Sequence, residues 1–396
     1  MINLSKAQQM ILEAAPVLGR ESVPILDSLR RVLAQDIVAI EDHPATDISA
    51  MDGYAVRFAS LAGISDQTPV TLRIIGESPA GRPCGKIVGD GEAVRIMTGG
   101  LIPDGADTVV KIELTTETEG YVTCTGNPRR GIGIRFRGDS MKKGEVVLCA
   151  GDVVTPLGVG ALASLRRAHV FVHRKPVVAI VSTGDELSDF HEPAIPGKTM
   201  SSNLYALSAQ VLEAQAIPMS LGIVGDDIEA QRGLLAEALR ADVIITSGGT
   251  SRGKYDLVHK AFASLGLETR YSNIFVKPGK PTIFGTIGKT LIFGLPGNPA
   301  AAMLSFDQFI RPTLFKMMGY PNGSDALLGQ TNSLGQEGPF SHIDSFNKEM
   351  GGNKDHRRPS QVPLEKNRSG NRRQLPHSSE TAEPDTPSEQ LKLSAS

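Results

Sequence analysis

The sequence predicts a multidomain α/β plus β protein, and three stretches of the chain indicate this class. In residues 176–320, short apolar runs alternate with amphipathic segments, the pattern of a three-layer α/β/α domain with a mostly parallel sheet. In residues 49–137, β-rich runs are separated by Gly, Pro and Asp turns, which predicts a small β-rich domain. Residues 1–48 and 138–175 remain, and we expect them to form one discontinuous, helix-containing connecting domain.

The last part of the chain has a different composition. Beyond Gly319 the apolar rhythm stops, and residues 321–396 are rich in Ser, Asn, Gln, Pro and charged side chains. Such a composition cannot bury enough apolar surface to offset the entropy lost on ordering. The sequence therefore predicts a disordered C-terminal tail.

The first half of the chain carries two helix signals. Ser5, followed by Gln8, has the spacing of a capping box, and the apolar positions after it predict a helix over about residues 5–18. A second helix is expected to begin at Thr155 and Pro156, between the strand-like runs EVVLCAG and VFVH.

The α/β region can be divided into its elements in the same way. The strand runs are VVAIVS, IPMSLGIV and VIITS. Helices are expected at about 203–215, 228–239 and 256–264, followed by a hairpin near 274–294 and a helix from Pro299 to Met318.

Composition and charge exclude several classes of partner. The formal net charge is −2, whereas proteins that bind nucleic acid usually carry a basic excess. No apolar run approaches the roughly 18 residues of a membrane span. Cys84, Cys124 and Cys149 show no CxxC spacing, so we expect buried thiols in a reducing cytoplasm rather than a zinc site. We expect neither a nucleic acid nor a membrane as partner.

Acidic residues follow three of the predicted strands. VVAIVS runs into Asp185 and Glu186, IPMSLGIV runs into Asp226, and VIITS leads towards Asp256. Ligands of open parallel sheets bind at the carboxyl ends of the strands, where these loops converge. Carboxylates gathered at one edge suit a hard cation, so the sequence predicts Mg²⁺ there.

The same edge carries residues suited to anions. Ser247, Gly248 and Gly249 follow VIITS, and the paired glycines would let backbone N–H groups approach a phosphate closely. Lys277 and Lys280 lie on a loop stiffened by prolines and could hold a tetrahedral oxyanion. One further stretch opens a helix whose N-terminus favours anions, namely Pro296, Gly297, Asn298 and Pro299.

Each of these stretches alone is more often an ordinary turn. Their joint position after successive strands favours a functional site. In the β-rich region, Met51-Asp52-Gly53 and Thr98-Gly99-Gly100 fit hairpin turns as well as they fit a site, and both interpretations stay open on the residues alone.

Six motifs along the chain together resemble those of one protein family. The combination is similar to the bacterial molybdopterin molybdenumtransferases and their eukaryotic relatives, including the gephyrin E domain, over about residues 4–320. The motifs are SAMDGYAV (49–56), RIMTGGLIP (95–103), STGDEL (182–187), SGGTSRGKYD (247–256), KPGKP (277–281) and GLPGNP (294–299).

The resemblance implies an enzyme that inserts molybdate into adenylylated molybdopterin and releases AMP, with Mg²⁺ present. It also implies a homodimer whose site lies between the α/β domain of one subunit and the N-terminal parts of the other. Molybdopterin adenylyltransferase could be a partner as well.

The resemblance further assigns a role to each candidate residue. Magnesium and phosphate would be handled by Asp185, Glu186, Asp226 and Asp256. The pterin phosphate would be cradled by Ser247, Gly248 and Gly249. Molybdate would be held by Lys277 and Lys280, while Asp52 and Thr98 would come from the facing subunit.

Two other functions remain open. Molybdopterin adenylyltransferase has a single domain that resembles residues 176–320 only, and the motif SAMDGYAV speaks against it. A catalytically weakened pterin-binding or scaffold protein is the second alternative, because the family ends in a compact β-rich domain and nothing from Asn322 onward resembles it.

Overall fold

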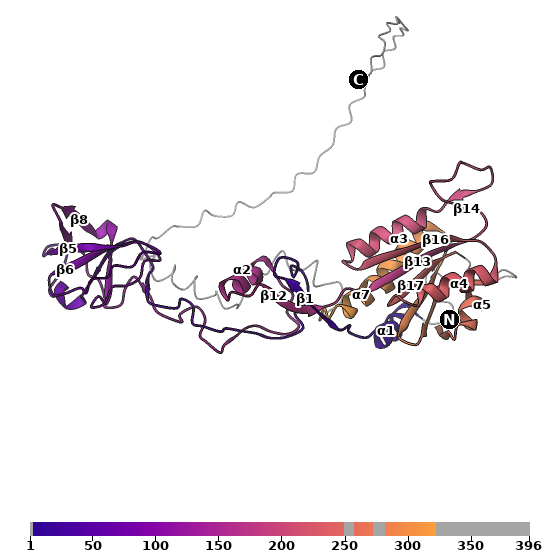
Figure 1. Ribbon diagram of the computed structural model, residues 1–396, viewed down its shortest axis with the longest axis horizontal. Helices are drawn as coiled ribbons and strands as arrows, with labels where there is room; N and C mark the ends of the chain where they lie inside the picture. The colour runs from indigo at the N-terminus through magenta and orange to yellow at the C-terminus, as the bar shows by residue number, and fades with distance from the viewer. Residues whose placement is uncertain (1–2, 249–256, 272–281, 322–396) are drawn as a thin grey trace, which may run out of the picture. The chain divides into compact units, whose positions relative to one another are not determined.

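The computed structural model describes residues 3–248, 257–271 and 282–321 (Figure 1). Its main features are two six-stranded sheets, each with a core of its own, and several short two-stranded pairs. The predicted tail from residue 322 onward lies outside the described residues.

The α/β region is built on one of the two large sheets. Its strand order is β16-β13-β17-β20-β19-β18, and the first four strands run parallel, as the sequence predicts. The last two strands are antiparallel to their neighbours. In chain order the strands are β13 (Val177–Thr183), β16 (Ile217–Val224), β17 (Val243–Ser247), β18 (Glu268–Tyr271), β19 (Ile283–Ile287) and β20 (Thr290–Leu295).

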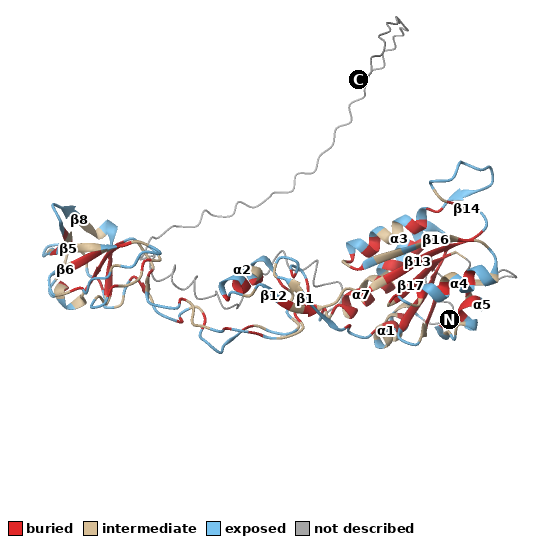
Figure 2. Ribbon diagram, in the orientation of Figure 1, coloured by how far each residue is buried: buried red, intermediate tan, exposed pale blue. Residues whose placement is uncertain are grey.

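Helices cover both faces of this sheet, because its central strands are apolar on both sides. Along β13, Val178 and Ile180 belong to one core, and Ala179 and Val181 belong to the other. Figure 2 shows these strands as buried. The first core includes α1 (Leu4–Ala14), α3 (Ser202–Glu213), α6 (Pro299–Ser305) and α7 (Arg311–Met317); the second includes α4 (Ile228–Ala238) and α5 (Leu257–Ser264).

The first helix is shorter than predicted. It begins after Asn3, whose side chain accepts a hydrogen bond from the backbone N–H of Lys6 at 2.8 Å, so Ser5 is not the cap. It ends at Ala14 rather than near residue 18. Pro16 disfavours helical conformation at the residue before it, which explains the early end.

The helix predicted from Pro299 to Met318 is interrupted in its middle. α6 is followed by a π-helical turn (Phe306–Ile310) and then by α7. Pro312 has no N–H to donate to the carbonyl of Gln308, four residues earlier. That carbonyl instead accepts a hydrogen bond from Nε2 of Gln8, at 3.1 Å.

The second large sheet occupies the β-rich region. Its order is β7-β4-β6-β5-β9-β8, with β5 and β6 parallel and the other neighbours antiparallel. Its core includes Tyr54, Leu72 and Val122. The elements are β4 (Gly53–Val56), η1 (Phe58–Leu61), β5 (Val70–Ser78), β6 (Glu92–Ile96), β7 (Thr108–Lys111), η2 (Ile112–Leu114), β8 (Thr115–Thr118) and β9 (Tyr121–Cys124).

Segments far apart in the sequence pair in the connecting region. β1 (Arg20–Pro24) pairs with β12 (His169–His173), and β2 (Ile37–Val38) pairs with β11 (Val146–Leu148). Thr155 caps α2 (Pro156–Ser164) by accepting from the N–H of Gly158 at 3.1 Å, as the sequence predicts. The remaining short strands are β3 (Ile48–Ser49), β10 (Ile134–Arg135), β14 (Leu187–Ser188) and β15 (Thr199–Met200). The domain boundaries themselves stay predictions.

Two further expectations concern the cysteines and the membrane. Cys124 is buried, but Cys84 is half-buried and Cys149 is exposed, so the prediction of three buried thiols is wrong. Across the described ranges, no helix is both long enough and apolar enough to cross a membrane.

Candidate functional site

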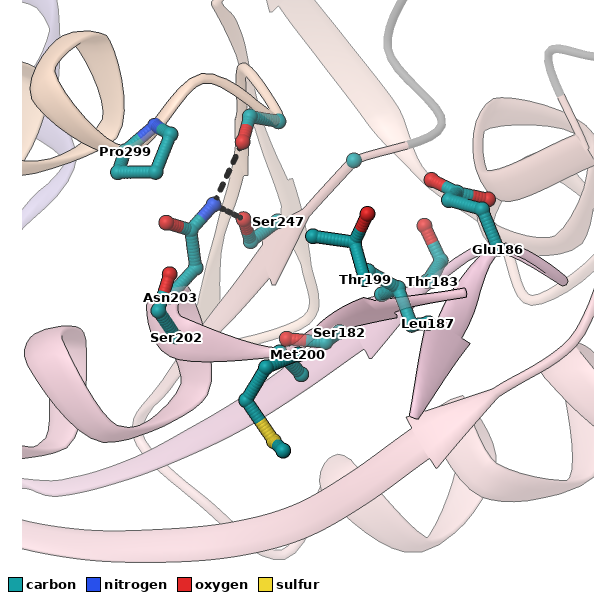
Figure 3. A pocket seen from close by; sticks show the side chains of 13 residues that line it. Ser182, Thr183, Glu186, Leu187, Thr199, Met200, Ser202, Asn203, Ser247 and Pro299 are labelled. Atoms are coloured by element: carbon teal, nitrogen blue, oxygen red, sulfur yellow. Dashed lines mark hydrogen bonds between the residues drawn. The ribbon is translucent and has the colours of Figure 1, made fainter. Parts of the chain in front are cut away.

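A pocket lies at the carboxyl ends of β13 and β17, beside the starts of α3 and α6 (Figure 3). It therefore occupies the edge at which ligands of open parallel sheets bind. Its volume is about 120 Å³. Pockets that enclose a drug-sized ligand usually measure roughly 300–1,000 Å³, so this one matches a single small group of a ligand.

Two of the predicted phosphate-binding residues line this pocket, Ser247 and Gly248. Gly248 has φ +97°, and a Cβ at this position would lie only 2.6 Å from the carbonyl oxygen of Thr183. The position requires glycine both for its backbone conformation and for the close approach of the two loops. Gly249 lies outside the described residues.

The GLPGNP stretch reaches the same place. Gly297 and Pro299 line the pocket, whereas Pro296 is buried and does not. Asn298 caps α6, because its Oδ1 accepts a hydrogen bond from the N–H of Ala301 at 3.0 Å. This N-terminus is thus capped by the chain itself rather than left for an anion.

Asn203 is a pocket residue that sequence reasoning missed. Its Nδ2 donates to Ser247 Oγ at 2.6 Å and to the carbonyl of Gly297 at 2.9 Å, as the dashed lines in Figure 3 show. It ties the start of α3 to the end of β17 and to the loop after β20. A polar side chain in the first turn of a helix near the predicted site was the only signal in the sequence.

Three of the four predicted acidic residues gather at the same edge of the sheet. Asp185 Oδ1 accepts a hydrogen bond from the backbone N–H of Asp226 at 2.9 Å. A Cβ on Gly225 would lie 2.6 Å from that oxygen, so the approach needs a glycine there. Glu186 lines the pocket.

Asp226 is sensitive to its acidic neighbours. Partial burial raises the pKa of its carboxyl, and the negative charges of Asp185 and Glu186 raise it further, against the smaller lowering effect of a hydrogen bond from the backbone of Asp185. The negative charges that surround Asp226 could be compensated by a cation.

The predicted metal ligands do not form a ready metal centre in the described part of the chain. No group of three His, Cys, Asp or Glu side chains there is arranged to hold a metal ion. Asp256, the fourth predicted ligand, lies outside the described residues, as do Lys277 and Lys280. Asp185, Glu186 and Asp226 nevertheless offer the oxygen donors and the negative charge that Mg²⁺ prefers.

Asp52 and Thr98 are brought together in the β-rich region. Asp52 Oδ1 accepts hydrogen bonds from the backbone N–H of Thr98 at 2.7 Å and from its hydroxyl at 2.9 Å. These two bonds, the backbone one first, lower the pKa of Asp52 despite a small opposing effect of burial. The pair arises because β4 and β6 are neighbours, with Gly53 opposite Ile96.

The turn interpretation of Thr98-Gly99-Gly100 also has a structural basis. The N–H of Gly100 donates to the carbonyl of Met97 at 2.8 Å, which closes a tight turn with Gly99 at φ +80°. Thr98 is therefore both a turn residue and the hydrogen-bond partner of Asp52.

Two known protein families together match almost the whole described chain. Residues 2–165 match the family described as MoeA N-terminal region (domain I and II), and residues 179–316 match the one described as probable molybdopterin binding domain. The chain is 38% identical over 299 residues to the molybdopterin molybdenumtransferase of Bacillus subtilis, covering 74% of this chain and 70% of that protein. It is 35% identical over 322 residues to that of Haemophilus influenzae, covering 81% and 78%.

Solved structures agree with these relatives. The crystal structure of the molybdopterin biosynthesis moea protein from Pyrococcus horikosii superposes with a TM-score of 0.70 at 32% identity, covering 81% of each chain. A second structure of the moeA protein, from Pyrococcus horikoshii OT3, gives 0.71 at 30% identity, over 81% of this chain and 80% of that one. The mixed α/β multidomain fold is thus similar to that of these proteins. Sequence and fold together show that the chain belongs to the molybdopterin molybdenumtransferase family, transferases of molybdenum cofactor biosynthesis.

Proposed function

We propose that the chain inserts molybdate into adenylylated molybdopterin and releases AMP in a Mg²⁺-dependent reaction. One observation carries the proposal: Asp185, Glu186 and Asp226 gather at the same sheet edge as a small pocket. Carboxylates beside a pocket for an anionic group are what a phosphate-releasing reaction requires.

Magnesium fits these residues by donor type and charge. The three carboxylates supply hard oxygen ligands, and the pKa of Asp226 is raised first by burial and then by the negative charges of Asp185 and Glu186. Asp185, Glu186 and Asp226 would hold the ion, together with Asp256 as the sequence suggests. When bound, Mg²⁺ would neutralise charge that develops on the pyrophosphate as AMP leaves.

The residues of the pocket bind and orient the substrate. Ser247 Oγ accepts its hydrogen bond from Asn203, and its own proton has no acceptor among the described residues. The hydroxyl is therefore free to donate to a phosphate oxygen, with its direction fixed by Asn203. Such prearranged donors stabilise a developing charge without reorganising.

The remaining parts of the proposal rest on the family. Lys277 and Lys280 would hold molybdate. Asp52 and Thr98 would complete the site from the second subunit of a homodimer, and molybdopterin adenylyltransferase would deliver the substrate.

An assay of AMP release tests the proposal. Purified protein is mixed with adenylylated molybdopterin, molybdate and Mg²⁺, and AMP is followed by chromatography. We expect AMP only when both molybdate and Mg²⁺ are present. Formation of adenylylated molybdopterin from ATP and molybdopterin would instead indicate an adenylyltransferase, which the N-terminal family match over residues 2–165 disfavours. Pterin binding without any AMP would indicate a scaffold.

A further inference from the structure

One peptide group in the acidic loop after β16 is held from both sides. Its N–H belongs to Asp226 and donates to Asp185 Oδ1 at 2.9 Å. Its carbonyl belongs to Gly225 and accepts a hydrogen bond from Gln231 Nε2, also at 2.9 Å. Because the peptide bond is planar, the two bonds together fix the orientation of the whole group. They therefore set the position from which the Asp226 carboxylate extends.

Gln231 comes from the buried face of α4. The buried positions of this helix are Gln231, Leu235 and Ala238, whose spacing places them on one face. Gln231 is 1% exposed, and an amide at such a depth costs free energy unless it is hydrogen-bonded. Its Oε1 has no partner in the described ranges, so the contribution of this amide is its bond to Gly225.

The loop needs an anchor of this kind because of Gly225. The close approach of Asp185 Oδ1 leaves no room for a Cβ at this position. A glycine, however, is the residue whose backbone is least restricted in conformation. Gln231 supplies from a helix the restraint that the loop itself lacks.

The two bonds also connect Gln231 to two of the proposed metal ligands. The amide of Gln231, the peptide group and the Asp185 carboxylate form a chain of hydrogen bonds in which each bond polarises the next. One proposed ligand, Asp185, lies at the end of this chain, and another, Asp226, is attached to its middle. Residues that orient metal ligands from behind in this way influence the affinity for the ion.

We propose that Gln231 is a positioning residue of the magnesium site, which sets the geometry of Asp185 and Asp226 through the peptide group between them. The assignment rests on the proposed function. It gives Gln231 no contact with the metal or the substrate, so its effect is on the affinity for Mg²⁺ rather than on the chemical step.

Gln231→Met removes the donor and keeps a side chain of similar length. We expect Mg²⁺ affinity, measured by calorimetry on the full chain, to fall by roughly tenfold or more, as is usual when a group that orients a metal ligand is lost. The Mg²⁺ concentration for half-maximal AMP release should rise by the same factor. The rate at saturating Mg²⁺ should change less, because both carboxylates are still present. Unchanged Mg²⁺ affinity would overturn the proposal.

The matched control is Gln210→Met, on the opposite face of the sheet. Gln210 is also buried, and its Nε2 donates to the carbonyl of Met303 and to Asp307 Oδ1, both at 3.2 Å. Both variants lose buried hydrogen bonds, so urea denaturation should show reduced stability in each. Only Gln231→Met should weaken Mg²⁺ binding, and equal weakening in both variants would overturn the proposal.

Hydrogen exchange gives a readout that needs neither Mg²⁺ nor substrate. In the metal-free protein, the amide of Asp226 should exchange faster in Gln231→Met, whereas Gln210→Met should leave its rate as it is. An unchanged rate in Gln231→Met would overturn the proposal. Mg²⁺-dependent AMP release with the same Mg²⁺ affinity in Gln231→Met would disprove the positioning role alone. Faster exchange and weaker Mg²⁺ binding without any AMP release would disprove the proposed reaction alone.

A measurement on the unaltered protein covers the case in which Gln231→Met fails to fold. Nitrogen NMR follows the side-chain amides of Gln231 and Gln210 as Mg²⁺ is added. The signal of Gln231 should shift, because the charge of the ion acts along the chain of hydrogen bonds, and that of Gln210 should stay in place. No shift at Gln231, or an equal shift at both, would overturn the proposal.

Discussion

Asn203 Nδ2 donates one hydrogen bond to Ser247 Oγ, at 2.6 Å, and another to the carbonyl oxygen of Gly297, at 2.9 Å. One side chain at the start of α3 thus joins the end of β17 to the loop that follows the neighbouring parallel strand β20. Asn203 is 8% exposed, so water cannot readily replace its side chain.

We expect Asn203→Ala to destabilise the protein by about 1–3 kcal/mol, because it leaves buried partners without their donor. Urea denaturation measures the change. Combining it with Ser247→Ala in a double-mutant cycle should give a coupling of about 0.5–3 kcal/mol, since the two residues are in contact. Strictly additive effects would show that the bond does not contribute.

The sequence could not reveal this relationship. Asn203 and Ser247 are 44 residues apart, and Asn203 and Gly297 are 94 apart, so only the folded sheet brings them together. Predictions that depend on the local pattern of apolar residues agree better with the structure. The run VIITS coincides with β17 (Val243–Ser247), because a buried parallel strand needs a continuous apolar stretch.

Helix boundaries were harder to predict for a related reason. α1 ends early at a proline, and the long C-terminal helix contains a π turn whose freed carbonyl is bonded by Gln8, 300 residues away. Of the site, the sequence predicted the acidic loops and Ser247-Gly248. It could not show that Gln231 would hold one of these loops from α4.

Asp226→Asn should separate stability from activity. The pKa of Asp226 is raised in the folded protein, so the favourable contribution of its protonated form is present at low pH and lost as pH rises through that pKa. At neutral pH the ionised group opposes folding. Without Mg²⁺ we expect the variant to be more stable at pH 7, by less than about 1 kcal/mol because the site is partly solvated.

The same variant should release AMP far more slowly, because an amide lacks the charge that a hard cation requires. Thermal melts with and without Mg²⁺ should show a larger stabilisation of the unaltered protein than of the variant. Asp227→Asn is the control, since Asn caps α4 about as well as Asp. Full Mg²⁺-dependent turnover in Asp226→Asn would contradict the proposed metal site.

Gly248→Ala should destabilise the protein by more than the cost of its backbone strain alone. Gly248 and Gly197 both have positive φ, +97° and +88°, but only at Gly248 would a Cβ meet the chain, 2.6 Å from Thr183 O. Each substitution carries about 1–3 kcal/mol of backbone strain. Chemical denaturation should show a clearly larger loss for Gly248→Ala than for Gly197→Ala, and equal losses would mean that the close approach is unimportant.

Thr98→Val should raise the pKa of Asp52 part of the way towards its ordinary value of 3.8. The change removes the hydroxyl donor but keeps the backbone N–H, which has the larger lowering effect. Carbon NMR of the Asp52 carboxyl measures the shift, with Thr98→Ser as the control that retains the hydroxyl. An unchanged midpoint in Thr98→Val would show that the hydroxyl bond has no influence.

Stability should follow the same pH dependence. Because the folded-state pKa of Asp52 is lowered, its hydrogen bonds stabilise the protein above the unfolded pKa, and this contribution is lost as pH falls through the folded pKa. The difference between Thr98→Val and the unaltered protein should therefore shrink on acidification below about pH 4. A constant difference would point to a packing effect instead.

The proposed contribution of Asp52 from a second subunit can be tested by complementation. Asp52→Asn and Asp226→Asn chains are each expected to lose AMP release when alone. In a dimer of one Asp52→Asn chain and one Asp226→Asn chain, a site built from both subunits would receive either two altered residues or none. Because random pairing makes about half of the dimers mixed, co-expression should restore about one quarter of the unaltered activity. A site within one chain would always contain one altered residue, and mixing would restore nothing. Mass photometry of the mixture checks that dimers form, so that a failure to complement is assigned to the location of Asp52 rather than to a lack of assembly.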